Sequence, residues 1–243
     1  MKRIVQSFSL MLVLICTAPG AQAITLAELF NGGSITAGDK LFDNWQLLNH
    51  VASDGRELNA GNIEVTALDD GGLNPGPGLD FSVANNELSI TGDGLYAFVD
   101  LMFGFRVSVL DPLRRITDNS LELTDGFYTW VEDVGIFNDV GFYIRETVGT
   151  SPWTSDLGIK EVEFSLLDGV STAILDDLAA FPPRSEIWVT KNILVWAVAE
   201  TDSAALFGFE QRFSQTVIPE PGTLVLLALG GVGLLIARRK SLI

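Results

Sequence analysis

Short runs in which apolar and polar residues alternate recur along this chain, and they constrain its fold more than any other feature. In one run Ile63, Val65 and Ala67 alternate with polar residues, and residues 161–166 repeat the pattern. A period of two places every second side chain on the same face of a β-strand. Each run therefore predicts a strand with one face in a core and the other in water.

Further β-rich runs are separated by Asp-Gly, Asn-Asn and Gly-Pro dipeptides, which favour turns. They cover residues 79–83, 87–90, 95–110, 127–131, 140–148, 187–199 and 206–217. Asn85-Asn86 predicts a hairpin between the first two runs. Residues 95–110 are too many for one ordinary strand, so we expect Gly104 to mark a bulge or bend. Asn192 similarly predicts a turn between Trp188 and Trp196.

Helical signals are few. Residues 25–30 begin with a potential capping box formed by Thr25 and Glu28, and a second helical turn is expected at 172–180, before a Pro-Pro pair. Residues 69–78 are rich in Asp, Gly and Pro and predict a long surface loop. The pattern as a whole predicts an all-β fold with little helix: a single antiparallel β-sandwich, jelly-roll-like, over residues 24–217.

The charge of the chain excludes one class of partner. There are 15 basic and 31 acidic residues, a formal net charge of −16, and residues 24–217 alone contain 10 basic and 30 acidic residues. Such an acidic surface repels phosphate backbones, so we expect no nucleic-acid binding. Cys16 is the only cysteine, which excludes disulfides, thiol catalysis and cysteine metal sites from residue 24 onward.

The N-terminus has the parts of a secretory signal. Lys2 and Arg3 precede an apolar stretch, and Ala21 and Ala23 form a small-x-small cleavage site. Residues 1–23 are therefore predicted to be a signal peptide, whose partners are the secretion translocon and signal peptidase.

The C-terminus reads as a second targeting segment, residues 218–243. Two prolines prevent a helix from running through the motif formed by Pro219, Glu220, Pro221 and Gly222. Residues 223–237 carry no charge and are followed by the basic residues Arg238, Arg239 and Lys240. Fifteen residues make about 22 Å of helix, which is short for a membrane span. The basic end can snorkel, and we predict a transmembrane helix that acts as a temporary tether.

Together the two ends resemble the PEP-CTERM family of bacterial surface proteins, in which a signal peptide is paired with a C-terminal Pro-Glu-Pro motif, a transmembrane helix and a basic terminus. The resemblance implies processing by an exosortase in a Gram-negative bacterium that makes exopolysaccharide. It also implies transient inner-membrane tethering and then release to the cell surface or the extracellular (biofilm) matrix. Residues 29–45 are more loosely similar to the opening of a group of such ectodomains whose role is not assigned. Neither resemblance implies an activity for residues 24–217.

Candidate site residues in the body are sparse. His50, the only histidine, is interpreted as structural, and no catalytic residue is assigned. Asp69, Asp70 and Asp80 are weak calcium candidates, since their loops also offer oxygen atoms from residues such as Asn74; Asp93 with Asp100 is another such pair. Trp153 stands beside a proline among small polar residues and is the best candidate for an exposed, sugar-stacking ring. No cofactor other than calcium is expected.

Three functions remain open for the body. The leading one is a non-enzymatic surface or matrix protein with a structural or interaction role. The second is a carbohydrate-binding module that uses exposed aromatic rings, with or without calcium as an aid, and has exopolysaccharide as its partner. The third is a secreted glycoside hydrolase, which would require two facing carboxyl groups in one cleft.

Overall fold

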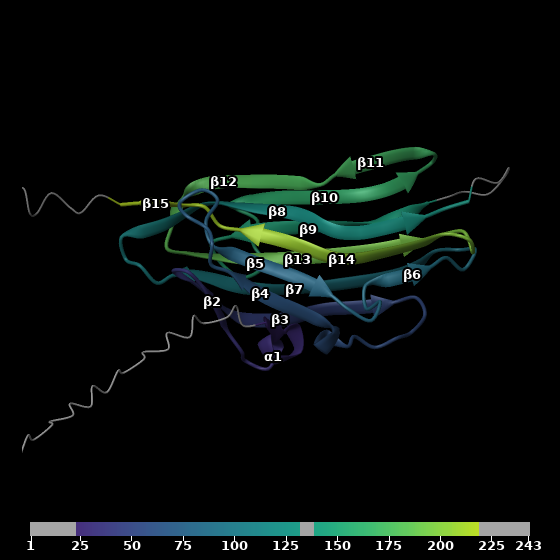
Figure 1. Cartoon of the computed structure of the whole chain (residues 1–243), viewed down its shortest axis with the longest axis horizontal. Coiled ribbons are helices and arrows are strands. Elements are labelled where there is room, and N and C mark those ends of the chain that lie inside the picture. The colour runs from purple at the N-terminus through teal and green to yellow at the C-terminus, as the bar shows by residue number, and fades with distance from the viewer. Residues whose placement is uncertain (1–22, 132–138, 219–243) are drawn as a thin grey trace, which may run out of the picture.

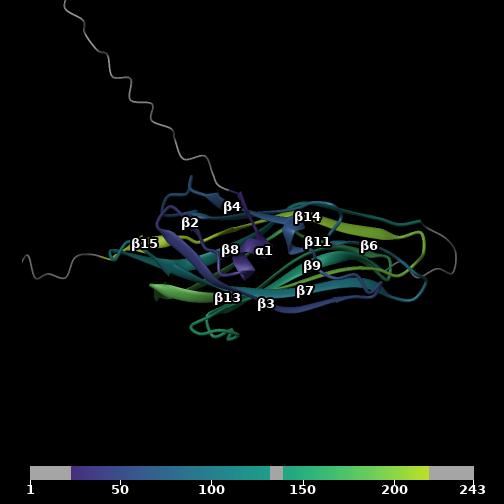
Figure 2. The ribbon, with the colours of Figure 1, turned by 90° about the horizontal axis from the view of Figure 1, so that it is seen from below.

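The computed structural model describes residues 23–131 and 139–218. In these residues two antiparallel sheets lie face to face, and the strands run along the long axis of the molecule (Figure 1). Seen at 90° to that view, the sheets form two layers (Figure 2). The predicted all-β sandwich with little helix is therefore confirmed; the finer jelly-roll-like assignment stays a prediction.

One sheet has eight strands, and its main path runs in the order β1-β4-β5-β14-β8-β12. These are β1 (Ala23–Thr25), β4 (Ile63–Leu68), β5 (Gly78–Val83), β14 (Ser203–Arg212), β8 (Arg114–Thr129) and β12 (Asp176–Arg184). Two short strands join it at the side: β15 (Gln215–Val217) pairs with β8, and β6 (Ser89–Thr91) pairs with β14.

The other sheet has seven strands in the order β11-β10-β9-β13-β7-β3-β2. These are β11 (Val170–Ile174), β10 (Gly158–Leu167), β9 (Val140–Gly149), β13 (Glu186–Ala197), β7 (Ala97–Val109), β3 (Lys40–Ala52) and β2 (Ile35–Ala37). The helices of the described residues are α1 (Leu26–Phe30) and the 3₁₀ turn η1 (Ala60–Asn62).

Aromatic rings fill much of the space between the sheets. The Trp45 ring stacks on Phe105 at 4.3 Å, and Phe81 stacks on Phe209 at 4.4 Å. All four are buried, and each such side chain stabilises the fold by roughly 1.5–3 kcal/mol. The core thus sits between the layers and leaves the outer face of each sheet free to carry a site.

Two sequence predictions are confirmed in detail. The alternating run at residues 63–68 is β4, in which Ile63, Val65 and Ala67 are buried. Helix α1 begins with the predicted capping box: Glu28 N–H donates to Thr25 Oγ1 at 3.3 Å, and Thr25 N–H donates to Glu28 Oε2 at 2.9 Å.

The predicted Asn85-Asn86 hairpin is wrong. Both asparagines have positive φ and make a tight turn, but β5 and β6 do not pair with each other. Instead they lie one after the other along β14, which pairs with β5 at Gly208–Arg212 and with β6 at Ser203–Ala205. β6 therefore runs in the same direction as β5 along one side of β14. The turn interrupts this line of strand and does not reverse the chain.

The second predicted helical turn, at residues 172–180, is also wrong. This segment contains the end of β11 and the start of β12, strands at the edges of opposite sheets. Ile174, Leu175 and Leu178 have a spacing that fits a helix, but they are exposed on these edges. These apolar side chains therefore do not form the buried face of a helix.

The long runs predicted to break are continuous strands. All of β13 pairs with β7 without a register shift, so neither Gly104 nor Asn192 interrupts its strand. The irregularities lie in β3, whose register against β7 shifts between Asp43 and Gln46 and again between Leu47 and Asn49. Gly104 instead makes room for the Trp153 ring at the outer face of its sheet.

Candidate functional site

A groove lies on the outer face of the seven-stranded sheet. Residues that point away from the core in β9, β13 and β7 stand side by side: Arg145, Asn192 and Met102 form one row, and Thr147, Thr190 and Gly104 form the next. The groove has a volume of about 620 Å³. Its lining consists of Leu48, Met102, Tyr143, Arg145, Thr147, Trp153, Thr190 and Asn192.

Trp153 is one of the residues that line this groove. It comes from the loop between β9 and β10, and 48% of its surface is exposed, as the sequence predicted. A Cβ added to Gly104 would lie 2.7 Å from Trp153 Cζ3 and 2.9 Å from the carbonyl oxygen of Val189. The missing side chain at residue 104 therefore lets the indole ring approach the backbone of the sheet.

The loop holds Trp153 in place. The Asp156 carboxylate accepts hydrogen bonds from Thr150 N–H (2.9 Å), Thr150 Oγ1 (2.8 Å) and Thr154 Oγ1 (2.8 Å). These bonds, led by that of the Thr150 backbone, lower the pKa of Asp156 to about 2. Trp153 itself has a φ of 65°, a conformation that costs of order 1–3 kcal/mol outside glycine. An exposed ring that is held in a strained conformation is positioned by its surroundings before any ligand arrives.

Hydrogen bonds between polar side chains hold them in place next to the ring. Asn192 Nδ2 donates to Asp100 Oδ1 at 2.7 Å, and the Tyr143 hydroxyl donates to Asn192 Oδ1 at 3.2 Å. Burial raises the pKa of Tyr143, and the Asp100 carboxylate adds to the effect, so the phenol keeps its proton and remains a donor. Arg145 is exposed, and its guanidinium has no ion pair or hydrogen bond to a described residue. The groove thus offers a free cation beside fixed polar groups.

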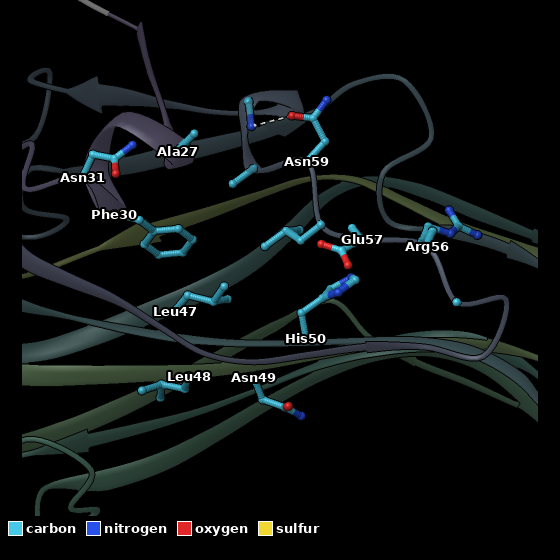
Figure 3. Close-up of a pocket in the computed structure, with 14 residues that line it drawn as sticks. Ala27, Phe30, Asn31, Leu47, Leu48, Asn49, His50, Arg56, Glu57 and Asn59 are labelled. Atoms are coloured by element: carbon cyan, nitrogen blue, oxygen red, sulfur yellow. Dashed lines mark hydrogen bonds between the residues drawn. The ribbon is translucent and has the colours of Figure 1, made fainter.

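A second hollow, of about 780 Å³, lies between the end of α1, β3 and the loop around Glu57 (Figure 3). His50 and Glu57 face each other across it. His50 Nε2 is buried and has no hydrogen-bond partner among the described residues, and Arg56 is ion-paired with Asp54 at 2.6 Å. The single histidine thus lines a hollow rather than the groove under Trp153.

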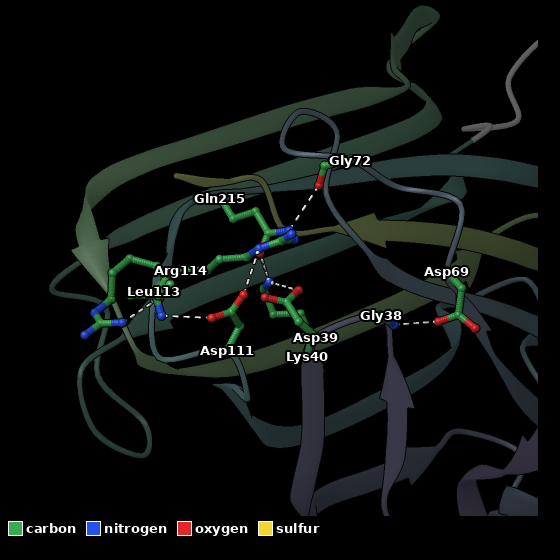
Figure 4. Close-up of polar contacts among 10 residues, drawn as sticks. Gly38, Asp39, Lys40, Asp69, Gly72, Asp111, Leu113, Arg114 and Gln215 are labelled. Atoms are coloured by element: carbon green, nitrogen blue, oxygen red, sulfur yellow. Dashed lines mark hydrogen bonds and ion pairs between the residues drawn. The ribbon is translucent and has the colours of Figure 1, made fainter. Parts of the chain in front are cut away.

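The calcium candidates lie apart from the groove and have other partners. Asp69 Oδ1 accepts a hydrogen bond from Gly38 N–H at 2.6 Å (Figure 4), and Asp70 Oδ1 lies 2.9 Å from Arg212 Nη1. Asp80 is in β5 beside Glu210 of β14; burial, followed by the charge of Glu210, raises the pKa of Asp80. The described residues contain no cluster of three or more acidic, histidine or cysteine side chains arranged for a metal ion. Calcium binding stays a prediction.

The second acidic pair is engaged as well. Asp93 Oδ1 accepts a hydrogen bond from Leu95 N–H at 2.9 Å, and Asp100 holds Asn192. The Asp93 carboxylate therefore stabilises a turn, and the Asp100 carboxylate orders a side chain of the groove.

The end of the molecule that leads to the C-terminal tail is tied together by buried polar contacts (Figure 4). Lys40 is fully buried and contacts Asp39 at 2.6 Å and Gln215 Oε1, while Gln215 Nε2 donates to the carbonyl oxygen of Gly72 at 3.1 Å. Burial lowers the pKa of Lys40, and the hydrogen bond to Asp39 opposes the shift. Ile218 N–H still donates to the Leu113 carbonyl oxygen at 2.7 Å. The folded body therefore extends to residue 218.

The predicted targeting residues lie mostly outside the described part of the chain. Ala23 starts β1, whereas Ala21, the motif Pro219 to Gly222, the predicted transmembrane helix and the basic residues Arg238, Arg239 and Lys240 are not described. Among the residues that are described, no helix is both long and apolar enough to cross a membrane. Signal cleavage and the transmembrane helix stay predictions.

Residues 217–240 match a family model described as the PEP-CTERM protein-sorting motif. The chain therefore carries this sorting motif, which begins at the last residue of β15, as the resemblance predicted. The match covers the terminal segment alone and leaves the β-sandwich unassigned. None of the curated proteins compared with the chain gives a match.

Two solved structures are similar to parts of the sandwich. One is TmCBM61 in complex with β-1,4-galactotriose, at 14% identity over 72% of this chain and 88% of that one, with a TM-score of 0.23. The other is the enzymatically active domain of tailspike protein 4 of bacteriophage CBA120, at 11% identity, with a TM-score of 0.21. That match covers 72% of this chain but only 19% of the tailspike chain. At these TM-scores neither likeness bears on the fold or function of the protein.

Proposed function

We propose that this protein is exported, tethered briefly by its C-terminal tail, processed by an exosortase and displayed at the cell surface or in extracellular polysaccharide. There, the groove under Trp153 binds a polysaccharide chain without cleaving it. The observation that carries the binding role is Trp153 itself: an exposed indole ring held over a glycine, beside an ordered set of polar groups.

Support for sorting comes from the motif match at residues 217–240 and from its place at the end of the folded body. Replacing Pro219, Glu220 and Pro221 with alanine removes the restriction that keeps the motif extended. We expect an unprocessed, membrane-bound form to accumulate, detected by immunoblotting of fractionated cells. Maturation at the normal rate in this variant would refute processing through the motif.

The chemistry of the groove matches that of a sugar chain. A pyranose has an apolar face, which stacks on an aromatic ring, and a rim of hydroxyl groups, which exchange hydrogen bonds with side chains. Trp153 supplies the ring, and Arg145, Thr147, Thr190 and Asn192 supply donors and acceptors at its side. The loop and the Asp100–Asn192–Tyr143 bonds fix these groups in advance, which lowers the entropic cost of binding.

Affinity electrophoresis or titration against a panel of bacterial polysaccharides tests this role. Trp153→Ala should abolish retention while lowering the free energy of unfolding by no more than roughly 1–2 kcal/mol, since about half of the residue is exposed. Trp130→Ala is the matched control, because Trp130 is 42% exposed but lies outside the groove. Equal retention of the wild type and Trp153→Ala, or no retention on any polysaccharide, would exclude the groove.

The lining of the groove does not favour a glycoside hydrolase or a calcium-assisted binding site. Its described lining contains no carboxyl group, whereas a glycoside hydrolase needs two and a calcium-assisted site needs several oxygen ligands. We therefore expect retention to survive a chelator and expect no release of reducing ends from the bound polysaccharide. A chelator-sensitive complex would restore calcium as a ligand.

A further inference from the structure

A row of charged side chains crosses the interior of the sandwich. Lys160 of β10, Glu146 of β9 and Lys191 of β13 stand side by side in the register of the seven-stranded sheet, and all three point into the core. None has any exposed side-chain surface. Buried charges of this kind are costly unless they are paired, so the row requires an explanation.

Glu146 links this row to the opposite sheet. Its Oε2 accepts a hydrogen bond from Lys191 Nζ, and its Oε1 accepts one from the side-chain amide of Gln211 in β14 at 2.8 Å. Gln211 is fully buried, and its carbonyl oxygen Oε1 has no hydrogen-bond partner among the described residues. A single carboxylate therefore holds an amine from one sheet and an amide from the other.

The charges in the row do not balance if both lysines are protonated, because one carboxylate faces two ammonium groups. Burial lowers the pKa of Lys191, against the opposing attraction of Glu146. Burial also lowers the pKa of Lys160, to about 8. Lys191 lies over the rings of Phe81 (5.7 Å) and Phe209 (5.2 Å), which exclude water. A lowered pKa favours the neutral form of the amine, and a neutral amine is a nucleophile.

We propose that Lys191 and Gln211 form an intramolecular isopeptide bond that joins the two sheets. Nζ of the neutral Lys191 amine attacks the side-chain carbonyl carbon (Cδ) of Gln211, and Glu146 takes one proton from the attacking nitrogen as the bond forms. A new C–N bond forms, the bond from Cδ to Nε2 breaks, and Glu146 returns the proton to the departing nitrogen. The products are a secondary amide and ammonia, so atoms and charge balance without an oxidant or a co-reactant.

The surrounding side chains fit this step. Negative charge develops on Gln211 Oε1 during the attack, and because no described residue donates a hydrogen bond to that oxygen, a nearby cation has to balance the charge. Lys160 Nζ contacts the same Glu146 oxygen as the amide, at 2.6 Å, but is not aligned for a hydrogen bond to it. A protonated Lys160, which contacts the same carboxylate oxygen as the amide, is the cation that we assign to this role. Because the site is closed, no solvent water competes with the amine for the carbonyl carbon.

Peptide mapping tests the proposal directly. The full chain is produced in bacteria, denatured and digested with a protease that cuts at acidic residues, and the peptides are measured by mass spectrometry. We expect the peptides containing Lys191 and Gln211 as one cross-linked species, about 17 Da lighter than their sum because ammonia is lost. Two separate peptides of unmodified mass would overturn the proposal, and so would a loss of about 18 Da in a species joining Lys191 to Glu146.

Three variants identify the roles. Glu146→Gln should leave both peptides unlinked, because no base remains between the amine and the amide. Gln211→Met removes the electrophile but keeps a side chain of similar volume. It tests the reaction even if Glu146→Gln fails to fold. Lys160→Met, in contrast, should still form the link, more slowly. A Lys160–Gln211 species in the wild type would assign the wrong lysine and refute the stated reaction.

Discussion

Arg145 and Glu146 are neighbours in β9, yet one is exposed and the other is fully buried. Arg145 points outward into the groove, where its guanidinium is exposed and has no described partner. Glu146 points inward, is fully buried, and contacts Lys160, Lys191 and Gln211. Their environments differ because successive side chains of a strand point to opposite faces of the sheet.

This difference divides the seven-stranded sheet into a face for recognition and a face for cohesion. On the outer face, a polar residue can change without leaving a buried charge, so substitutions should alter binding more than stability. On the inner face, each polar group depends on the others, so removal of one leaves its partners unsatisfied. Substitutions on the two faces should therefore have opposite effects on binding and on stability.

Glu146→Leu should have the largest effect of any substitution considered. It leaves the buried amines of Lys160 and Lys191 without a carboxylate, which costs about 3–5 kcal/mol in comparable buried pairs. Unfolding in urea, followed by tryptophan fluorescence, measures the loss. Arg145→Gln is the control, with an expected change within about 0.5 kcal/mol. Similar losses in both variants would remove the distinction between the faces.

The pH dependence of stability sharpens the comparison. The pKa of Lys160 is about 8 in the folded protein, below its ordinary value of 10.5, so between these values the unfolded chain binds the extra proton. Stability must then rise with pH, on the order of 1–2 kcal/mol between pH 8 and pH 9.5. Lys160→Met should reduce this rise, because only Lys191 and Lys40, whose pKa values are also lowered by burial, still contribute to it, while Arg145→Gln should keep it in full. Urea midpoints across that range provide the measurement.

Much of the fold could be predicted from residue patterns, but not where strands are irregular. Regular alternation identified β4 and the middle of β10. Strand β3 was not predicted, because its two register shifts break the period of two, and Asn44 has a φ of 54° beside the first shift. Most of β8 was also missed, because its alternation contains few apolar residues, with Ile116 and Leu121 among the few that are buried.

The site could be predicted only in its exposed part. Trp153 was identified because its neighbours in sequence are polar and small. Gly104, which lies against its ring, and Asn192, which lines the same groove, are interpreted from the sequence as strand breaks, since their role depends on strands that are distant in sequence. The buried row was missed for a related reason: Lys160, Glu146 and Lys191 look like solvent-facing charges, and only the register brings them together.

Gly104→Ala tests how closely the groove depends on the glycine beneath the ring. The new Cβ would lie 2.7 Å from Trp153 Cζ3, so the indole must move away from the sheet. We expect about a tenfold loss of affinity for the bound polysaccharide, equivalent to about 1.4 kcal/mol. Ser108→Ala, on the same face of β7 but outside the groove, should bind normally. Unchanged affinity in Gly104→Ala would mean that the ring does not need its observed position.

Asp156→Asn should give the smallest effect, because it loosens the loop without touching the groove. The amide cannot accept all the bonds that the carboxylate receives from Thr150 and Thr154, so Trp153 becomes less ordered before binding. We expect roughly a threefold loss of affinity at pH 7 and faster hydrogen exchange at Thr150. In the wild type the pKa of Asp156 is lowered, so the carboxylate orders the loop at pH values above about 4, and this ordering is lost as the pH falls through about 2. Asp176→Asn, on the edge strand β12, should leave both affinity and exchange unchanged, and a similar loss there would assign the effect to overall charge.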